Sequence, residues 1–104
     1  MGRAENMGFN EIKYRAIQKL KEGLVQHEER KEKEKNLLAL GYLTNDDVID
    51  ILKYCTGIHY KTAPHDKMKL IMVHIFTPKR CKYEGYYVKL YFIEPDIWFI
   101  SVHD

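Results

Sequence analysis

Apolar residues in the first half of the chain recur at helical spacing in two segments. The first segment lies between Asn10 and Gly23, and the second between Thr44 and Gly57. Asparagine and threonine are favoured before a helix, and glycine is favoured just after one. We therefore predict a helix in each segment, with these apolar residues on their buried faces: Ile12, Ala16, Ile17, Leu20, Val48, Ile49, Ile51, Leu52 and Cys55.

A charged segment separates the two predicted helices. His27–Lys35 is nine residues long, contains no apolar side chain and leads into three leucines before Gly41. Its positive and negative charges are interspersed, which is typical of a solvated helix surface rather than a binding tail. We predict a third helix here, ending at Gly41.

The periodicity changes in the second half of the chain, where three segments are rich in β-forming residues. They are Met68–Phe76, Tyr86–Ile93 and Ile97–His103, and the segment from Ile58 to about Lys67 is predicted to be a loop. The short connections between the three segments indicate antiparallel pairing. We predict an α+β fold, with N-terminal helices packed on one face of a three-stranded antiparallel sheet.

Alternation along these strands predicts a dry face and a wet face. We expect an apolar face against the helices, formed by Ile71, Val73, Ile75, Tyr86, Val88, Leu90, Phe92, Trp98, Ile100 and Val102. The opposite face is expected to carry Met72, His74, Phe76, Tyr87, Lys89, Tyr91, Phe99, Ser101 and His103.

The chain has 104 residues, which is the size of one domain, so we expect a single domain over residues 1–104. The apolar segment Ile71–Phe76, which His74 interrupts, is far shorter than the roughly 18–20 residues of a membrane span. The charged N-terminus, with Arg3 and Glu5, lacks the apolar core of a secretory signal.

Cys55 and Cys81 do not have metal-site spacing, and we interpret them as reduced thiols of a cytoplasmic protein.

Positive charge is concentrated in the second half of the chain. The net charge is only +2, but the segment from Lys61 to Lys89 contains seven basic and two acidic residues. Four of the five histidines also follow residue 58. Charge of one sign in one region favours a polyanionic partner.

The predicted wet face contains the chemical groups that RNA cleavage requires. Histidine takes or gives a proton near neutral pH, while lysine and tyrosine stabilise a phosphate through charge and hydrogen bonding. His74, Tyr87, Lys89 and His103, together with Lys61 in the preceding loop, are therefore candidate site residues. No metal or cofactor is needed for this route. The alternative is structural: His74 as a half-buried strand residue, the tyrosines as ordinary strand formers and His103 frayed at the end of the chain.

Three short motifs resemble the MqsR-type toxins, which are RelE-like mRNA interferases of bacterial type II toxin–antitoxin systems. The motifs are His59–Thr62, Gly85–Leu90 and Phe99–His103, and the helix ending at Cys55 with its exit loop is also similar. The resemblance covers roughly residues 37–103.

The resemblance implies a metal-independent endoribonuclease that cuts mRNA, free or presented by the ribosome, and that a cognate antitoxin protein silences. The family's catalytic loop lysine corresponds to Lys61, its strand tyrosine to Tyr87 and its final-strand lysine to His103. The family's glutamine in the first strand has no equivalent, because Val73 occupies that position and His74 is the nearest polar residue.

We expect Lys61 and Lys89 to stabilise the phosphate, Tyr87 to donate a hydrogen bond, and His103 and His74 to exchange the proton. Further RNA contacts are expected from Lys89, Lys79, Arg80, Lys82 and Tyr91. Two alternatives use the same face. One is a module that binds RNA or protein without catalysis, and the other is a small regulator whose wet face is an oligomer interface.

Overall fold

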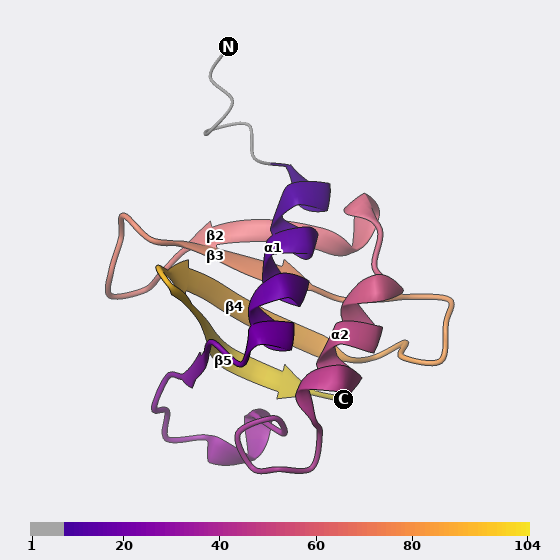
Figure 1. The fold of residues 1–104 in the computed structure, drawn as a ribbon, viewed down its shortest axis with the longest axis horizontal. Helices are drawn as coiled ribbons and strands as arrows, with labels where there is room; N and C mark the ends of the chain where they lie inside the picture. The colour runs from indigo at the N-terminus through magenta and orange to yellow at the C-terminus, as the bar shows by residue number, and fades with distance from the viewer. Residues whose placement is uncertain (1–7) are drawn as a thin grey trace.

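The computed structural model describes residues 8–104, and within them two α-helices lie on one side of a five-stranded sheet (Figure 1). The helices are α1 (Phe9–Glu22) and α2 (Asn45–Lys53), and two short 3-10 helices are η2 (Lys33–Lys35) and η3 (Gly57–His59). The strands are β1 (Val25–His27), β2 (Tyr60–Pro64), β3 (Met72–Phe76), β4 (Tyr87–Ile93) and β5 (Asp96–His103).

The strand order in the sheet is β1-β5-β4-β3-β2. β1 pairs with β5 in parallel, and the other three pairings are antiparallel. The α+β class is therefore confirmed, but the prediction of a three-stranded antiparallel sheet was wrong, because the described chain forms a five-stranded mixed sheet.

The two capped helices form where the sequence predicts them. Gly23 follows α1 with a φ of 74°, and its N–H bonds the carbonyl of Leu20, so the residue uses the left-handed conformation that glycine tolerates. Thr44 precedes α2: its hydroxyl accepts from the N–H of Asp47 (3.1 Å), and the Asp47 carboxylate accepts from the N–H of Thr44 (2.8 Å). This reciprocal capping box fixes the start of α2.

The predicted third helix over the charged segment was wrong. Val25–His27 instead forms β1 at the sheet edge, and the chain then turns through η2. Main-chain hydrogen bonds from Ile97 N–H to Leu24 O and from Glu28 N–H to Phe99 O (both 2.9 Å) hold this segment to β5. These bonds to a distant strand replace the local ones of a helix.

The predicted loop before the sheet also contains regular structure. η3 and β2 occupy Gly57–Pro64, and β2 pairs along its whole length with β3. Lys61, expected in a loop, therefore lies on an edge strand, directly opposite Ile75.

The main core lies between the helices and one face of the sheet, which we call the helix face. The sheet contributes Phe76, Val88, Leu90, Ile97, Phe99 and Val102 to this core. A smaller cluster on the opposite face, which we call the outer face, contains Val73, Ile75, Tyr91 and Ile100, with Trp98 packed against it.

The predicted assignment of side chains to faces was right for β4, partly right for β5 and wrong for β3. In β3 it was inverted: Val73 and Ile75 are in the outer cluster, and Phe76 is in the helix-side core. In β5 a shift of register places Lys89 opposite Ser101 but Leu90 opposite Phe99. Ile100 is thus an additional residue, as in a β-bulge, and joins the outer cluster.

No helix within residues 8–104 is both long and apolar enough to cross a membrane. Arg3 and Glu5, on which the interpretation of the N-terminus depends, lie outside the described residues.

Candidate functional site

Tyr87 and His103 form the centre of the candidate site on the outer face. They are direct cross-strand partners at the start of β4 and the end of β5, and their rings stack with centroids 5.2 Å apart. The next pair along the same strands and on the same face is Lys89 and Ser101. The sheet therefore brings a phenol, an imidazole and an ammonium group together.

A groove of about 320 Å³ runs beside these residues. One part of its wall is Tyr87, Lys89, Ile100, Ser101 and His103, and the other part comes from the segment after β1: Arg30, Glu32 and Lys35. Its lining contains three cationic side chains and one carboxylate. Lys35 lies 3.5 Å from Glu32, and Arg30 pairs with Glu28 and Asp66, which are not in the lining, so the positive charge that favours an anionic ligand comes mainly from Lys89.

A second hollow adjoins the groove and shares Tyr87 and His103 with it. It has a volume of about 370 Å³ and is also lined by Lys79 and Glu84 of the β3–β4 connection. The stacked pair therefore separates Lys79 on one side from Arg30 and Lys35 on the other.

Lys61 lies on the outer face but does not line the groove. It is opposite Ile75, which is opposite Lys89, so the two lysines belong to one row across the sheet. Two strand spacings separate them, about 10 Å between strand axes. Lys61, Tyr87 and His103 thus share the outer face, although the sequence predicts Lys61 in a loop beside this face and not on a strand of the sheet.

His74 is not with them, which corrects the prediction for this residue. It is 8% exposed on the helix face, where its Nδ1 bonds the hydroxyl of Tyr60 (2.7 Å). Burial, together with the charge of Arg15, lowers the pKa of His74 to about 4. A neutral imidazole enclosed in the core cannot exchange protons with a ligand on the other side of the sheet.

Tyr91 lies on the outer face but is not available to stack on a base. It is 2% exposed, and its hydroxyl donates to Glu28 Oε1 (2.7 Å). Burial and this hydrogen bond raise the pKa of Tyr91. The predicted RNA contact, and an oligomer interface that uses this ring, are both inconsistent with its burial.

The basic residues of the β3–β4 connection separate into two groups. Lys79 adjoins the stacked pair, but Lys82 lies 3.5 Å from Asp50 and over the ring of Tyr54, so it faces α2. Arg80 has a positive φ of 59°, and its backbone N–H donates to Glu84. Of the three basic residues that the sequence offers here, Lys79 is the one that lines a hollow beside the candidate site.

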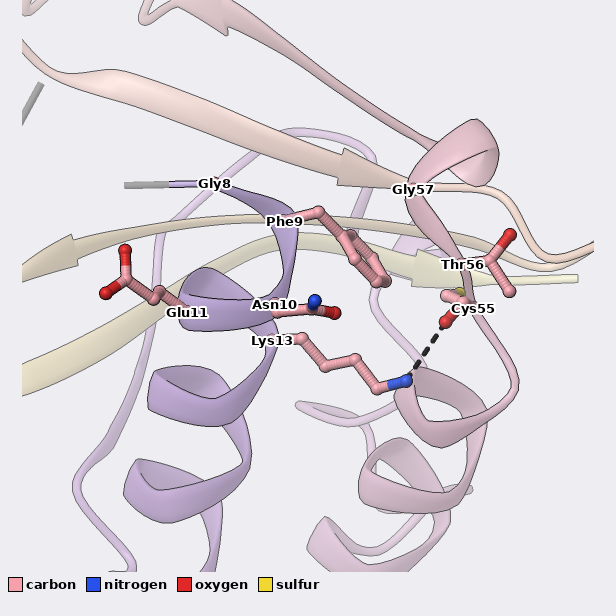
Figure 2. Close-up of a pocket in the computed structure, with 8 residues that line it drawn as sticks. All are labelled: Gly8, Phe9, Asn10, Glu11, Lys13, Cys55, Thr56 and Gly57. Atoms are coloured by element: carbon pink, nitrogen blue, oxygen red, sulfur yellow. Dashed lines mark hydrogen bonds between the residues drawn. The ribbon is translucent and has the colours of Figure 1, made fainter. Parts of the chain in front are cut away.

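A larger cavity, of about 580 Å³, lies at the start of α1 and the end of α2 (Figure 2). Lys13 crosses it to donate to the carbonyl oxygens of Cys55 (3.0 Å) and Lys53 (3.2 Å). This contact ties α1 to the C-terminal end of α2. The cavity contains none of the predicted catalytic or RNA-binding residues.

Sequence reasoning missed Arg30, Glu32 and Lys35 as lining residues. They lie in the charged segment that was interpreted as a solvated helix. A segment of mixed charge does not indicate that it follows an edge strand of the sheet, so its position beside β5 could not be predicted. Glu28 was missed for the same reason. Among residues 8–104, no group of three or more His, Cys, Asp or Glu side chains is arranged to hold a metal ion.

Comparisons with protein-family models, with curated proteins and with solved structures found no match to this chain.

Proposed function

We propose that this protein is the toxin of a type II toxin–antitoxin system, a metal-independent endoribonuclease that cuts mRNA. The observation that carries the proposal is the placement of Tyr87, Lys89 and His103 in one groove, with Lys61 on the same face of the sheet. The short motifs that resemble the MqsR-type toxins include these residues.

The proposed reaction uses the RNA's own 2′-hydroxyl as nucleophile. His103 takes the proton from this hydroxyl, the oxygen forms a bond to the adjacent phosphorus, and the bond from phosphorus to the 5′-oxygen breaks. The leaving 5′-oxygen takes a proton from the imidazolium of His103, or from the hydroxyl of the stacked Tyr87, whose phenolate then takes the proton from His103. Lys89 and Lys61 stabilise the additional charge on the phosphate oxygens. The products are a 2′,3′-cyclic phosphate and a 5′-hydroxyl.

An antitoxin is part of the proposal because the groove is cationic and exposed to solvent. A partner with an acidic or extended segment that covers it would block RNA and neutralise its charge. Co-expression with a small neighbouring gene is expected to give a stable complex without nuclease activity. A toxin that is tolerated at high level without any partner would contradict this part of the proposal.

The decisive experiment is an in vitro cleavage assay on single-stranded RNA with mapped ends, in the presence of EDTA. We expect the wild type to give cyclic-phosphate and 5′-hydroxyl ends, and Tyr87→Phe/His103→Ala to leave the RNA intact. The same sequence as 2′-O-methyl RNA serves as a control, because it lacks the nucleophile and should not be cut.

Two results would overturn the proposal or a part of it. Salt-sensitive RNA binding by the wild type without cut products would indicate the non-catalytic binding module instead. Loss of cleavage in EDTA would rule out the metal-independent route.

A further inference from the structure

Arg30 connects the groove to a buried hydrogen-bond network on the outer face. Its side chain lines the groove together with Tyr87 and Lys89, and its guanidinium makes ion pairs with Glu28 and with Asp66. The two partners differ in environment. The Glu28 side chain is 17% exposed, whereas that of Asp66 is 61% exposed.

Glu28 is held in place by two buried side chains. Its Oε1 accepts from the hydroxyl of Tyr91 (2.7 Å) and from Nε2 of His65 (2.8 Å), and both residues are 2% exposed. Nδ1 of His65 accepts from the backbone N–H groups of Lys67 (3.0 Å) and Met68 (3.1 Å). The neutral ring therefore has its proton on Nε2, directed at Glu28.

This arrangement leaves the other carboxylate oxygen, Oε2, for Arg30. Burial by itself would raise the pKa of Glu28, but the bonds from His65 and Tyr91 and the charge of Arg30 lower it. Glu28 thus stays ionised, and with Oε1 fixed it cannot turn away from Arg30. A carboxylate taken out of water is tolerated because its partners are all present.

The network fixes a guanidinium at the wall of the groove that Lys89 also lines. Arginine's planar set of donors matches the oxygens of a phosphate and can bind two of them at once. The Nε of Arg30 is itself buried and has no hydrogen-bond acceptor within residues 8–104, so it does not face the groove. The side chain as a whole is 32% exposed, and the donors that a ligand can reach are therefore those of Nη1 and Nη2, of which Nη1 lies 3.5 Å from its carboxylate partner Asp66. We propose that Arg30 is a phosphate-binding residue of the groove and that Glu28 is its positioning residue, an inference that rests on the proposed RNA substrate.

The test measures binding separately from cleavage. The probe is a single-stranded RNA oligonucleotide with 2′-O-methyl groups throughout, and its affinity is measured over a range of salt concentrations. Arg30→Ala is expected to weaken binding at low salt about tenfold. It should also reduce the slope of log K against log salt by about 0.7, the value for one phosphate contact to a single strand.

The other variants separate charge, geometry and position. Arg30→Lys should keep the wild-type salt slope but not the full affinity, since the charge remains and the planar set of donors is lost. Glu28→Gln should weaken binding in the same direction as Arg30→Ala. Asp66→Asn is the matched control, because it removes the exposed ion pair of the same guanidinium, and it should bind like the wild type.

Cleavage of unmodified RNA by the same variants distinguishes this inference from the proposed function. If Arg30→Ala binds with wild-type affinity and slope while the wild type cuts RNA, the assignment of Arg30 is wrong and the nuclease stands. If the wild type binds through Arg30 but cuts nothing, the nuclease is wrong and the assignment stands. If Glu28→Gln does not fold, Tyr91→Phe replaces it, and unchanged binding by that folded variant would overturn the positioning role.

Discussion

Tyr87 and His103 are cross-strand partners whose rings stack, with centroids 5.2 Å apart and planes inclined by 23°. The pairing presents a hydroxyl and an imidazole side by side in one groove. The two groups have different chemistry within the proposed reaction, so single substitutions should have different effects.

We expect His103→Ala to reduce the rate of RNA cleavage about 10²- to 10⁴-fold, the usual contribution of a positioned acid or base. Tyr87→Phe keeps the stacked ring and removes only the hydroxyl, so its loss should be smaller. The measurement is single-turnover cleavage at saturating protein. Tyr14→Phe, at an exposed position on α1, is the control and should cut at the wild-type rate. Wild-type cleavage by His103→Ala would refute the role of the imidazole.

Stability should depend on pH through His74. The pKa of His74 falls from 6.5 in the unfolded chain to about 4 in the folded protein, because burial and the charge of Arg15 disfavour the imidazolium. The unfolded chain therefore binds the proton first as the pH falls. The contribution of neutral His74 is complete above about pH 6.5 and is lost progressively towards pH 4, on the order of 3 kcal/mol in total.

Urea unfolding between pH 7 and pH 4 measures this loss. His74→Phe cannot be protonated at this position, so the free energy of unfolding of the wild type minus that of the variant should fall as the pH falls. His103→Gln, on the outer face, is the control, and the same subtraction of the His74→Phe value should give the same fall with pH. A constant difference between wild type and His74→Phe across this range would contradict the prediction.

The two cysteines should react with iodoacetamide at very different rates. Cys55 is 1% exposed, and burial raises the pKa of its thiol to about 11, so only about one thiol in a thousand is ionised at pH 8. Cys81 is partly exposed. Peptide mass spectrometry of the native protein should find Cys81 modified first, and unfolding in urea should make the two rates similar. Equal rates in the native protein would show that Cys55 is accessible.

Loss of the capping box should weaken the fold measurably. Thr44→Ala removes the hydroxyl that accepts from the N–H of Asp47, and we expect the free energy of unfolding to fall by about 1 kcal/mol. Thr44→Ser keeps the hydroxyl and should be close to wild type. Urea unfolding at pH 7 makes the comparison, and equal stability of the alanine and serine variants would exclude the cap as a source of stability.

The elements that the sequence predicts correctly depend on local signals. α1 and α2 have apolar residues at helical spacing and recognisable ends at Gly23 and Thr44. In β4 the side chains alternate clearly between the two faces, because the polar Lys89 lies between two apolar residues. Tyr87 is two residues from Lys89, so it is predicted on the same outer face. Most of the candidate groove on β4 and β5 follows from this alternation.

The errors arise where a strand does not alternate between polar and apolar residues, or where a strand pairs with another that is distant in the sequence. In β3 the residues next to His74 are apolar on both sides, and both faces of this strand are covered, so alternation does not say which face meets the helices. The bulge at Ile100 reverses the phase within β5. β1 is three residues long and exists through its parallel pairing with β5, which no local pattern indicates.

The sequence by itself determined two helices, three strands and the common orientation of Tyr87, Lys89 and His103, because each depends on the spacing of nearby residues. Only the tertiary structure decided that His74 is buried, that Tyr91 is tied to Glu28 and that Arg30 enters the groove. Those outcomes depend on main-chain pairing and on ion pairs between segments far apart in the chain. Spacing along the sequence contains no information about such contacts.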